Sequence, residues 1–328
     1  MRERRRTTAA GTRATLRGSG REAILSIDVG GTTTAAGLVS PDGSVLTHVE
    51  TPTHKAGPGT ALATLLDLLQ GLREAARSRS IDVAGIGIGV PGAVDADRGA
   101  VGADINYVPE LASVPLAETL AERLRLPVFV DNDVNVLALG EWMFGTGRGA
   151  SSLVVLALGT GVGGGIILGG RLHRGGGGYG GELGHVPINF DGRPCICGGR
   201  GCLKTYVSGT DIALQGTERL KRPVDAATVF LLADQGDPVA REIVEEVCQA
   251  LGAGLAVIVN GLNPELLLLA GSVAKSLKPR EREIRDQTGR YAFARALAST
   301  RIEILSMDKD ATIRGGAALY LYQTGGQA

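Results

Sequence analysis

Short apolar runs alternate in the first half of the chain with longer segments whose leucines and alanines recur every three or four positions. The short runs predict buried strands at residues 24–29, 35–40, 45–50, 83–90 and 127–130. The longer segments predict helices at residues 59–78, 116–125 and 134–144. This order of a strand hairpin followed by alternating helices and strands predicts an α/β sheet with helices on its faces.

The same plan begins again about 130 positions later. An apolar strand at 152–158, a Gly/Thr turn at 159–165 and a strand at 166–168 repeat the opening hairpin. Helices at 226–234 and 237–260, a strand at 266–270 and a last helix at 315–322 complete the pattern. The repetition predicts a duplicated domain with a cleft between the two halves.

The predicted organisation has three parts. Residues 1–21 are expected to form a disordered basic tail. Residues 22–133 are expected to form a small α/β lobe, against which the C-terminal helix at 315–328 packs back. Residues 134–314 are expected to form a larger α/β lobe.

Charge is unevenly distributed over the 328 residues. Residues 1–21 hold seven arginines and one acid, so the remainder holds 27 basic and 33 acidic residues, a net charge of about −6. An acidic body does not favour nucleic-acid binding, although the tail leaves a nucleic-acid or partner-binding arm as the minority interpretation. No run of 18 apolar residues and no signal peptide is present, and a cytoplasmic protein is expected.

Three of the four cysteines crowd into eight positions. Together with a histidine they give the spacing H-x9-C-x-C-x4-C, formed by His185, Cys195, Cys197 and Cys202. Thiolates and imidazole on a glycine-rich loop suit tetrahedral zinc, and four protein ligands leave no open position for water. The pattern therefore predicts a structural zinc site; the alternative is three buried thiols beside an unrelated histidine.

Two Gly/Thr turns, at residues 28–34 and 159–165, offer backbone N–H groups to phosphate oxygens. The second turn satisfies G-x-G-x-x-G, but a strand follows it, whereas a dinucleotide fingerprint opens a helix. No Walker-type P-loop is present. Each turn alone is as consistent with a structural hairpin; as a pair, with Asp28 placed to hold a Mg²⁺ hydration shell, they predict a phosphate clamp.

Polar residues follow the strand at 127–130, where Asp131-Asn132-Asp133 leads into a helix. Each is a common helix cap, but the carboxyl end of a sheet strand also faces the ligand crevice. A carboxylate at that position accepts the proton of an attacking hydroxyl in phosphoryl transfer. Further along, Glu182-x-x-His185 lies between glycines, which argues against a di-iron bundle helix and favours sugar contacts.

These segments together resemble the ROK family of sugar kinases and repressors, within the actin-like ATPase superfamily. The resemblance covers about residues 24–322 and rests on Asp28-Val29-Gly30-Gly31-Thr32, Gly89-Val90-Pro91-Gly92, Asp131-Asn132-Asp133, Gly159-Thr160-Gly161-Val162-Gly163-Gly164-Gly165, Glu182-x-x-His185 and Cys195-x-Cys197-Gly198-x-x-Gly201-Cys202.

The resemblance implies a two-lobed ribonuclease-H-like α/β fold, ATP with Mg²⁺ in the cleft, and transfer of the γ-phosphoryl to the 6-hydroxyl of a hexose, as in glucokinases. It implies that Asp133 is the catalytic base, that sugar is bound by Asn106, Asn132, Asp133, Glu182 and His185, and that nucleotide is bound by Asp28, Gly30, Gly31, Thr32, Thr33, Thr160, Gly161 and Gly271. His185 is implied to be a zinc ligand as well. The family also suggests a homodimer.

Two residues depart from the family pattern. Thr33 stands where Lys is usual, which leaves the phosphate loop intact. Lys204 stands where kinases of the family commonly carry a Glu that receives sugar hydroxyls. Replacing an acceptor with a cationic donor inverts the local hydrogen-bond demand. We therefore hypothesise that Lys204 binds a different sugar, such as the amino sugar kanosamine or a C1 or C2 variant; the alternative is that Lys204 points to solvent.

Two other function classes compete with the kinase. The family includes sugar-responsive DNA-binding regulators, but only about 23 residues precede Ile24, which is too short for their winged-helix module. An actin-like ATPase without a small-molecule acceptor would account for the phosphate turns but leave Glu182, His185 and the cysteines unexplained.

Overall fold

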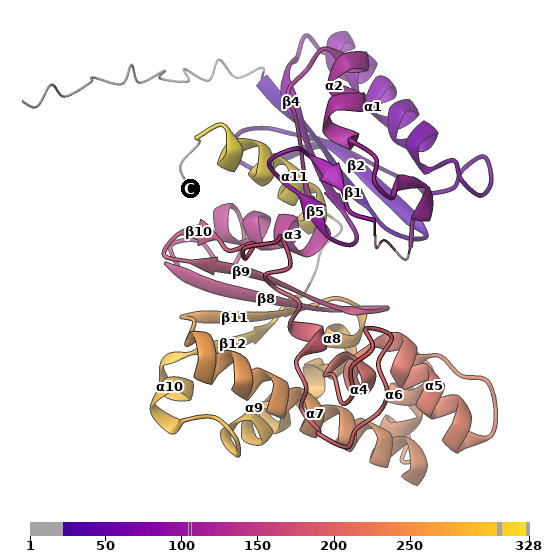
Figure 1. Ribbon diagram of the computed structural model, residues 1–328, viewed down its shortest axis with the longest axis vertical. Coiled ribbons are helices and arrows are strands. Elements are labelled where there is room, and N and C mark those ends of the chain that lie inside the picture. The colour runs from indigo at the N-terminus through magenta and orange to yellow at the C-terminus, as the bar shows by residue number, and fades with distance from the viewer. Residues whose placement is uncertain (1–21, 104, 106, 307–309, 326–328) are drawn as a thin grey trace, which may run out of the picture.

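The structure is a computed structural model that describes residues 22–103, 105, 107–306 and 310–325. Its two lobes lie one above the other, each built on a β-sheet (Figure 1). The predicted basic tail and Asn106 lie outside the described residues.

The first lobe contains a mixed sheet in the order β3-β2-β1-β4-β7. Its strands are β1 (Glu22–Val29), β2 (Thr33–Val39), β3 (Val45–Pro52), β4 (Asp82–Val90) and β7 (Val128–Asn132). β1 and β2 form an antiparallel hairpin, while β1, β4 and β7 run parallel. A short ribbon of β5 (Val94–Asp95) and β6 (Ala100–Val101) follows β4. The predicted strands of this half are confirmed.

The second lobe repeats this plan, with the sheet order β10-β9-β8-β11-β12. Its strands are β8 (Ser152–Leu158), β9 (Val162–Leu168), β10 (Arg171–Leu172), β11 (Leu266–Ala270) and β12 (Arg301–Ile304). β8 pairs antiparallel with β9 and parallel with β11, which in turn pairs parallel with β12. The same connectivity in both sheets confirms the predicted duplication.

Helices cover both sheets. α1 (Ala61–Ser78) and α2 (Leu116–Leu124) lie on the outer face of the first sheet, and α3 (Asp133–Met143) and α11 (Asp310–Gln323) lie between the two sheets (Figure 1). The single turn η1 (Pro109–Leu111) contacts α1. The far face of the second sheet is covered by a larger group: α4 (Lys204–Val207), α5 (Gly209–Leu220), α6 (Ala226–Asp234), α7 (Pro238–Leu262), α8 (Ser272–Leu277), η3 (Lys278–Arg280), α9 (Glu281–Gly289) and α10 (Ala294–Ser299). A single turn, η2 (Leu183–His185), precedes the cysteine loop.

The last helix, α11, packs against α3 and against the sheet of the first lobe. Ser26 on β1 donates a hydrogen bond to the carbonyl of Ile313 on α11. Two glycines let α11 approach β4, because a Cβ added to Gly87 would lie 1.8 Å from the Gly316 carbonyl oxygen. Close backbone contact of this kind requires glycine on the strand.

The predicted turn at 159–165 is too long, because β9 begins at Val162. Gly163 and Gly165 are strand residues that face α3. A Cβ added to Gly165 would lie 2.5 Å from the Val134 carbonyl oxygen, so these glycines serve helix packing and not a turn. The division between lobes at residue 133 stays a prediction, since α3 contacts both sheets. Among the described residues, every helix is too short or too polar to cross a bilayer.

Candidate active site

Three carboxylates meet at the edge of the first sheet, where its parallel strands end. Asp28 lies opposite Gly89 across β1 and β4, and Gly89 lies opposite Asp131 across β4 and β7. Asp133 follows as the first residue of α3, and a Cβ added to Gly89 would lie 3.2 Å from the Asp133 Cα. Strand register therefore places these acids together at the carboxyl edge, where open α/β sheets bind ligands.

Two of these carboxyl groups have altered acidity. Burial, and secondarily the charge of Asp28, raises the pKa of Asp133 to about 7. Burial raises the pKa of Asp28 to about 6, although a hydrogen bond with Thr312 acts in the opposite direction. Both side chains are surrounded by protein yet keep some contact with solvent. A carboxyl group that titrates near neutral pH suits general-base catalysis.

Asn132 fixes the start of α3. Its side-chain oxygen accepts from the backbone N–H groups of Val134 at 2.9 Å and Asn135 at 3.2 Å, and its Nδ2 donates to the Gly92 carbonyl at 3.0 Å. Asn132 is therefore the N-cap that the sequence offered as one interpretation. Because Asp133 is the next residue, this cap also holds the candidate base in place.

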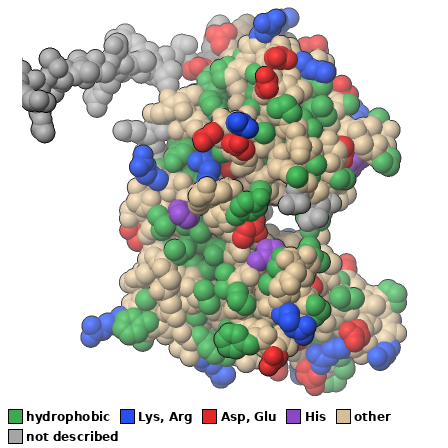
Figure 2. Space-filling model, in the orientation of Figure 1, with side chains coloured by type: hydrophobic (Ala, Val, Ile, Leu, Met, Phe, Trp, Pro, Cys, Tyr) green, Lys and Arg blue, Asp and Glu red, His purple; other side chains and the backbone are tan. Residues whose placement is uncertain are grey.

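A pocket lies between the two lobes, next to the N-terminus of α3. Its lining comes from both lobes and comprises Gly92, Ala93, Asn132, Asn135, Gly163, Gly164, Gly178, Gly180, Gly181 and Glu182. The surface is visibly hollowed between the lobes, with acidic and histidine side chains at the rim (Figure 2). Glu182, from the second lobe, thus faces the same pocket as Asn132, from the first.

The two Gly/Thr turns are short loops that end β1 and β8. Within the described residues, the backbone N–H groups of Gly31, Thr32, Thr160 and Gly161 donate no hydrogen bond to the protein. Thr33 is exposed at the start of β2. The turns themselves are anchored: Thr53 donates to the Gly30 carbonyl at 2.6 Å, and Gly209 N–H donates to the Gly159 carbonyl at 2.8 Å. Free N–H groups on an anchored loop are suited to binding phosphate.

Gly271 completes the second loop. It follows β11, which pairs with β8, and its φ of 99° lies in the left-handed region. A Cβ at this position would lie 2.5 Å from the Leu158 carbonyl oxygen, so the residue is glycine for steric reasons. The predicted nucleotide residue thus adjoins the loop at 159–161.

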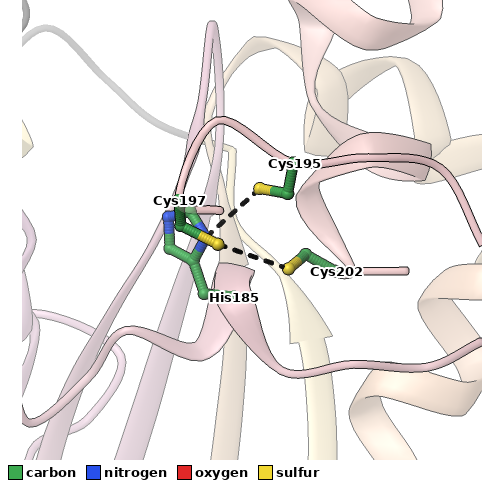
Figure 3. A group of neighbouring side chains, drawn as sticks. All are labelled: His185, Cys195, Cys197 and Cys202. Atoms are coloured by element: carbon green, nitrogen blue, oxygen red, sulfur yellow. Dashed lines mark hydrogen bonds between the residues drawn. The ribbon is translucent and has the colours of Figure 1, made fainter. Parts of the chain in front are cut away.

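The four predicted zinc ligands converge (Figure 3). One ligand atom from each of His185, Cys195, Cys197 and Cys202 lies within 4.8 Å of the others. Nδ1 of His185 is 3.5 Å from Sγ of Cys195, and Sγ of Cys197 is 3.7 Å from Sγ of Cys202. A zinc tetrahedron with the usual bond lengths has edges of about 3.6 Å between nitrogen and sulfur and about 3.8 Å between sulfurs. The donor set and its spacing therefore fit a zinc ion.

His185 presents different nitrogens to its two sides. Its Nδ1 faces the thiols, and its Nε2 is 3.9 Å from the Glu182 carboxylate. A metal on Nδ1 would leave Nε2 as an N–H donor on the side of Glu182. The cysteine loop contacts α7 through Arg193, which donates two 2.8 Å hydrogen bonds to the Glu246 carboxylate. The Arg193 guanidinium also packs over the Tyr206 ring.

Lys204 does not point freely to solvent. It begins α4, two residues after Cys202, and its side chain is only 15% exposed. Its Nζ is 3.5 Å from the Asp211 carboxylate, which also accepts a hydrogen bond from Ser208. The solvent-pointing interpretation is therefore wrong. Lys204 is absent from the pocket lining described above.

An ion pair between lobes was missed by the sequence analysis. Arg174, at the start of the glycine-rich loop 175–181, binds the buried Asp131 through Nε at 2.7 Å and Nη2 at 2.6 Å. Asn135 also donates to Asp131, at 3.0 Å. Nothing in the local pattern around Arg174 identifies a partner 43 residues away.

Comparison with known proteins identifies the family to which the chain is similar. The family model described as "ROK family" matches residues 24–323. The chain is 34% identical over 315 residues to a glucokinase of Halalkalibacterium halodurans, covering 91% of this chain and 95% of that protein. It is also 30% identical over 275 residues to a xylose repressor of Caldicellulosiruptor bescii, covering 79% of this chain and 68% of the repressor.

Solved structures of the same family superpose closely. A ROK hexokinase from Thermus thermophilus has a TM-score of 0.82 and 31% identity, covering 93% of this chain and all of that one. A ROK family glucokinase from Streptomyces griseus, solved with glucose and AMPPNP, has a TM-score of 0.73 and 29% identity, covering 90% and 98%. These neighbours confirm the two-lobed α/β fold expected from the sequence.

Proposed function

The chain belongs to the ROK family, and on that premise we propose that it is an ATP-dependent kinase of a hexose or a closely related sugar. The transferred group is the γ-phosphoryl and the acceptor is the 6-hydroxyl. Asp133 carries the proposal, because burial raises its pKa to about 7 at the start of a helix that borders the interlobe pocket. Kinase-named relatives along nearly the whole chain support the same reaction class.

In the proposed mechanism, the ionised Asp133 accepts the proton of the attacking sugar hydroxyl. Asn132 holds Asp133 in position by capping α3, and Glu182 accepts hydrogen bonds from sugar hydroxyls on the opposite wall of the pocket. The free N–H groups of the two phosphate loops bind the phosphate chain of ATP. Mg²⁺, when bound, neutralises phosphate charge, and Asp28 is placed to hold its hydration shell.

Zinc has a structural part in this proposal. The four ligands leave no open position, so the ion would fix the cysteine loop and the orientation of His185 without activating water. Zinc held by Nδ1 would leave the Nε2–H of His185 as the donor, and this N–H would bind the sugar beside Glu182.

Lys204 is proposed to alter sugar preference. Lys204 and Asp211 form a largely buried pair outside the lining of the interlobe pocket, so we propose that Lys204 acts on sugar preference by positioning the adjacent cysteine loop. We expect Lys204→Glu to change the order of preference among glucose, mannose, N-acetylated and 3-amino hexoses. An unchanged order would exclude this role. The matched control is Lys278→Glu, since Lys278 also pairs with a carboxylate but is 51% exposed after α8.

The proposal is tested by measuring ADP release from MgATP with and without a panel of hexoses and amino hexoses. A kinase requires the acceptor for rapid turnover and yields a phosphorylated sugar, whereas an ATPase hydrolyses ATP without it. Absence of turnover with every sugar, by protein that binds nucleotide, would contradict the proposal.

A sugar-responsive regulator is the second candidate, because the relatives include a xylose repressor that matches 79% of this chain. Such a protein would bind sugar without phosphorylating it. A homodimer is expected from the family and is checked by light scattering on the purified protein.

A further inference from the structure

One aromatic side chain lies between the two phosphate loops. Tyr107 belongs to the first lobe, and a Cβ added to Gly31 would lie 2.9 Å from the Tyr107 Cβ and 3.3 Å from its ring. A Cβ added to Gly161, in the second lobe, would lie 3.5 Å from the Tyr107 hydroxyl. The side chain therefore begins beside one loop and ends beside the other.

The segment around Tyr107 directs it away from the first core. Ile105 and Val108, on either side in the sequence, are buried in the core of the first lobe with α1 and α2. Tyr107 itself is 47% exposed. A large aromatic residue that is anchored on both sides yet held out of the core does not contribute mainly to packing.

The hydroxyl of Tyr107 is available to a ligand. Within the described residues it makes no hydrogen bond to the protein. The side chain adjoins Gly31 in one loop and Gly161 in the other, and the backbone N–H groups of these two glycines also donate no hydrogen bond within the described residues. The Tyr107 hydroxyl and these two N–H groups are thus donors without an acceptor among the described residues, and the oxygens of a phosphate chain are acceptors.

We propose that Tyr107 is a phosphate-contacting residue whose hydroxyl donates a hydrogen bond to the phosphate chain of a bound nucleoside triphosphate where the two lobes meet. The inference rests on the nucleotide-binding part of the proposed function. It assigns Tyr107 to the nucleotide and not to the sugar, because its hydroxyl adjoins Gly161 and Tyr107 is absent from the lining of the pocket that contains Glu182.

The test is calorimetric titration of wild type, Tyr107→Phe and Tyr107→Ala with MgAMPPNP and, separately, with AMP. Phenylalanine keeps the ring against Gly31 and removes only the hydroxyl. A hydrogen bond to a charged group is lost, so we expect MgAMPPNP to bind about tenfold more weakly to Tyr107→Phe. AMP, which lacks the outer phosphates, is expected to bind with unchanged affinity.

Tyr291→Phe is the matched control, because Tyr291 is 48% exposed after α9, away from the cleft. Its affinity for both nucleotides should equal that of wild type. In turnover, Tyr107→Phe should raise the KM for ATP and leave the KM for the sugar unchanged.

Three outcomes overturn the inference. Equal MgAMPPNP affinity in wild type and Tyr107→Phe would show that the hydroxyl touches no phosphate. An equal loss of affinity for MgAMPPNP and AMP in Tyr107→Phe would show that Tyr107 has a merely structural role. Wild-type protein that binds neither nucleotide would overturn both the inference and its premise. If Tyr107→Phe selectively lost affinity for MgAMPPNP and the wild type phosphorylated no sugar, the inference would stand and only the proposed kinase activity would be overturned.

Discussion

At the residue scale, the proposed chemistry depends on two carboxyl groups that the fold makes less acidic. Asp133 and Asp28 come from α3 and β1, and strand register brings them together at one sheet edge. Burial is the main cause of the raised pKa of both, and the charge of Asp28 adds to that of Asp133. A base with a pKa of about 7 combines sufficient ionisation with sufficient basicity at neutral pH.

The first prediction concerns the pH dependence of turnover. Since Asp133 acts only when ionised, kcat/KM should rise with pH and level off above an apparent pKa of about 7. Asp28→Asn removes the neighbouring negative charge, so the rising limb should move to lower pH even if the maximal rate falls. A pH profile of Asp28→Asn that coincides with that of wild type would exclude electrostatic coupling of the two groups.

The second prediction concerns stability. The folded-state pKa of Asp133 lies above the value of about 3.9 expected in an unfolded chain, so the folded protein binds more protons between these values. The contribution of Asp133 to the free energy of unfolding is thus most favourable below about pH 4, and it declines as pH rises to about 7.

Asp133→Asn, which carries no charge at any pH, should therefore raise Tm relative to wild type by a few degrees at pH 8, and by less at pH 5. Asp97→Asn, at an exposed position, should leave Tm unchanged at both values. Thermal unfolding followed by circular dichroism measures the difference; a Tm gain that is independent of pH would contradict the assigned pKa.

At the element scale, the contact between α11 and the first sheet depends on glycines. Gly87 on β4 faces Gly316 on α11 so closely that no side chain fits. Gly87→Ala is expected to reduce the free energy of unfolding by about 3 kcal/mol or more, since overpacking displaces backbone. Gly71→Ala is the control: Gly71 has open space on α1, and the change should stabilise the helix by about 0.5 to 1 kcal/mol. Chemical denaturation compares the two variants.

The cysteine loop gives the fourth prediction. The purified protein should contain one zinc per chain, and Cys202→Ser should lose it because a ligand is removed. Cys248→Ala should retain the metal, since Cys248 lies on α7 and is buried in the hydrophobic core of the second lobe. Elemental analysis gives the stoichiometry, and Tm should fall on chelation in wild type. Full metal content in Cys202→Ser would exclude this ligand set.

The sequence predicted elements best where its signal was local. Apolar runs located all five strands of the first sheet and β8, β9 and β11 of the second, and the Gly/Thr turns and the Asp131 to Asp133 segment located the candidate site. The sequence placed the start of β9 too late, because Gly163 and Gly165 lie in a glycine-rich run that is typical of a turn. In the structure they are strand residues that need to be glycine because α3 packs against them. The sequence missed α5, α9 and β12, and it missed the contacts of Arg174, Lys204 and Tyr107, because these depend on partners that only the tertiary fold brings near.

At the scale of the whole molecule, duplication creates the site. In each sheet, the turn of the first hairpin is a proposed phosphate loop. Because the lobes stack with α3 and α11 between them, the two loops face the same cleft. Glu182 and the cysteine loop come from the second lobe, whereas Asn132 and Asp133 begin the helix that joins the lobes. In the proposed mechanism, sugar and nucleotide meet between structures of similar topology, and turnover requires groups from both lobes.

The most direct test of this account compares wild type with Asp133→Asn in kcat and in binding of the best sugar and MgAMPPNP. We predict that kcat falls about 100-fold to 10,000-fold, because the general base is lost. Both affinities should stay within about threefold of wild type, since the amide preserves the shape of the site. A kcat in Asp133→Asn within a factor of about two of wild type would contradict the central claim that Asp133 removes the proton of the attacking hydroxyl.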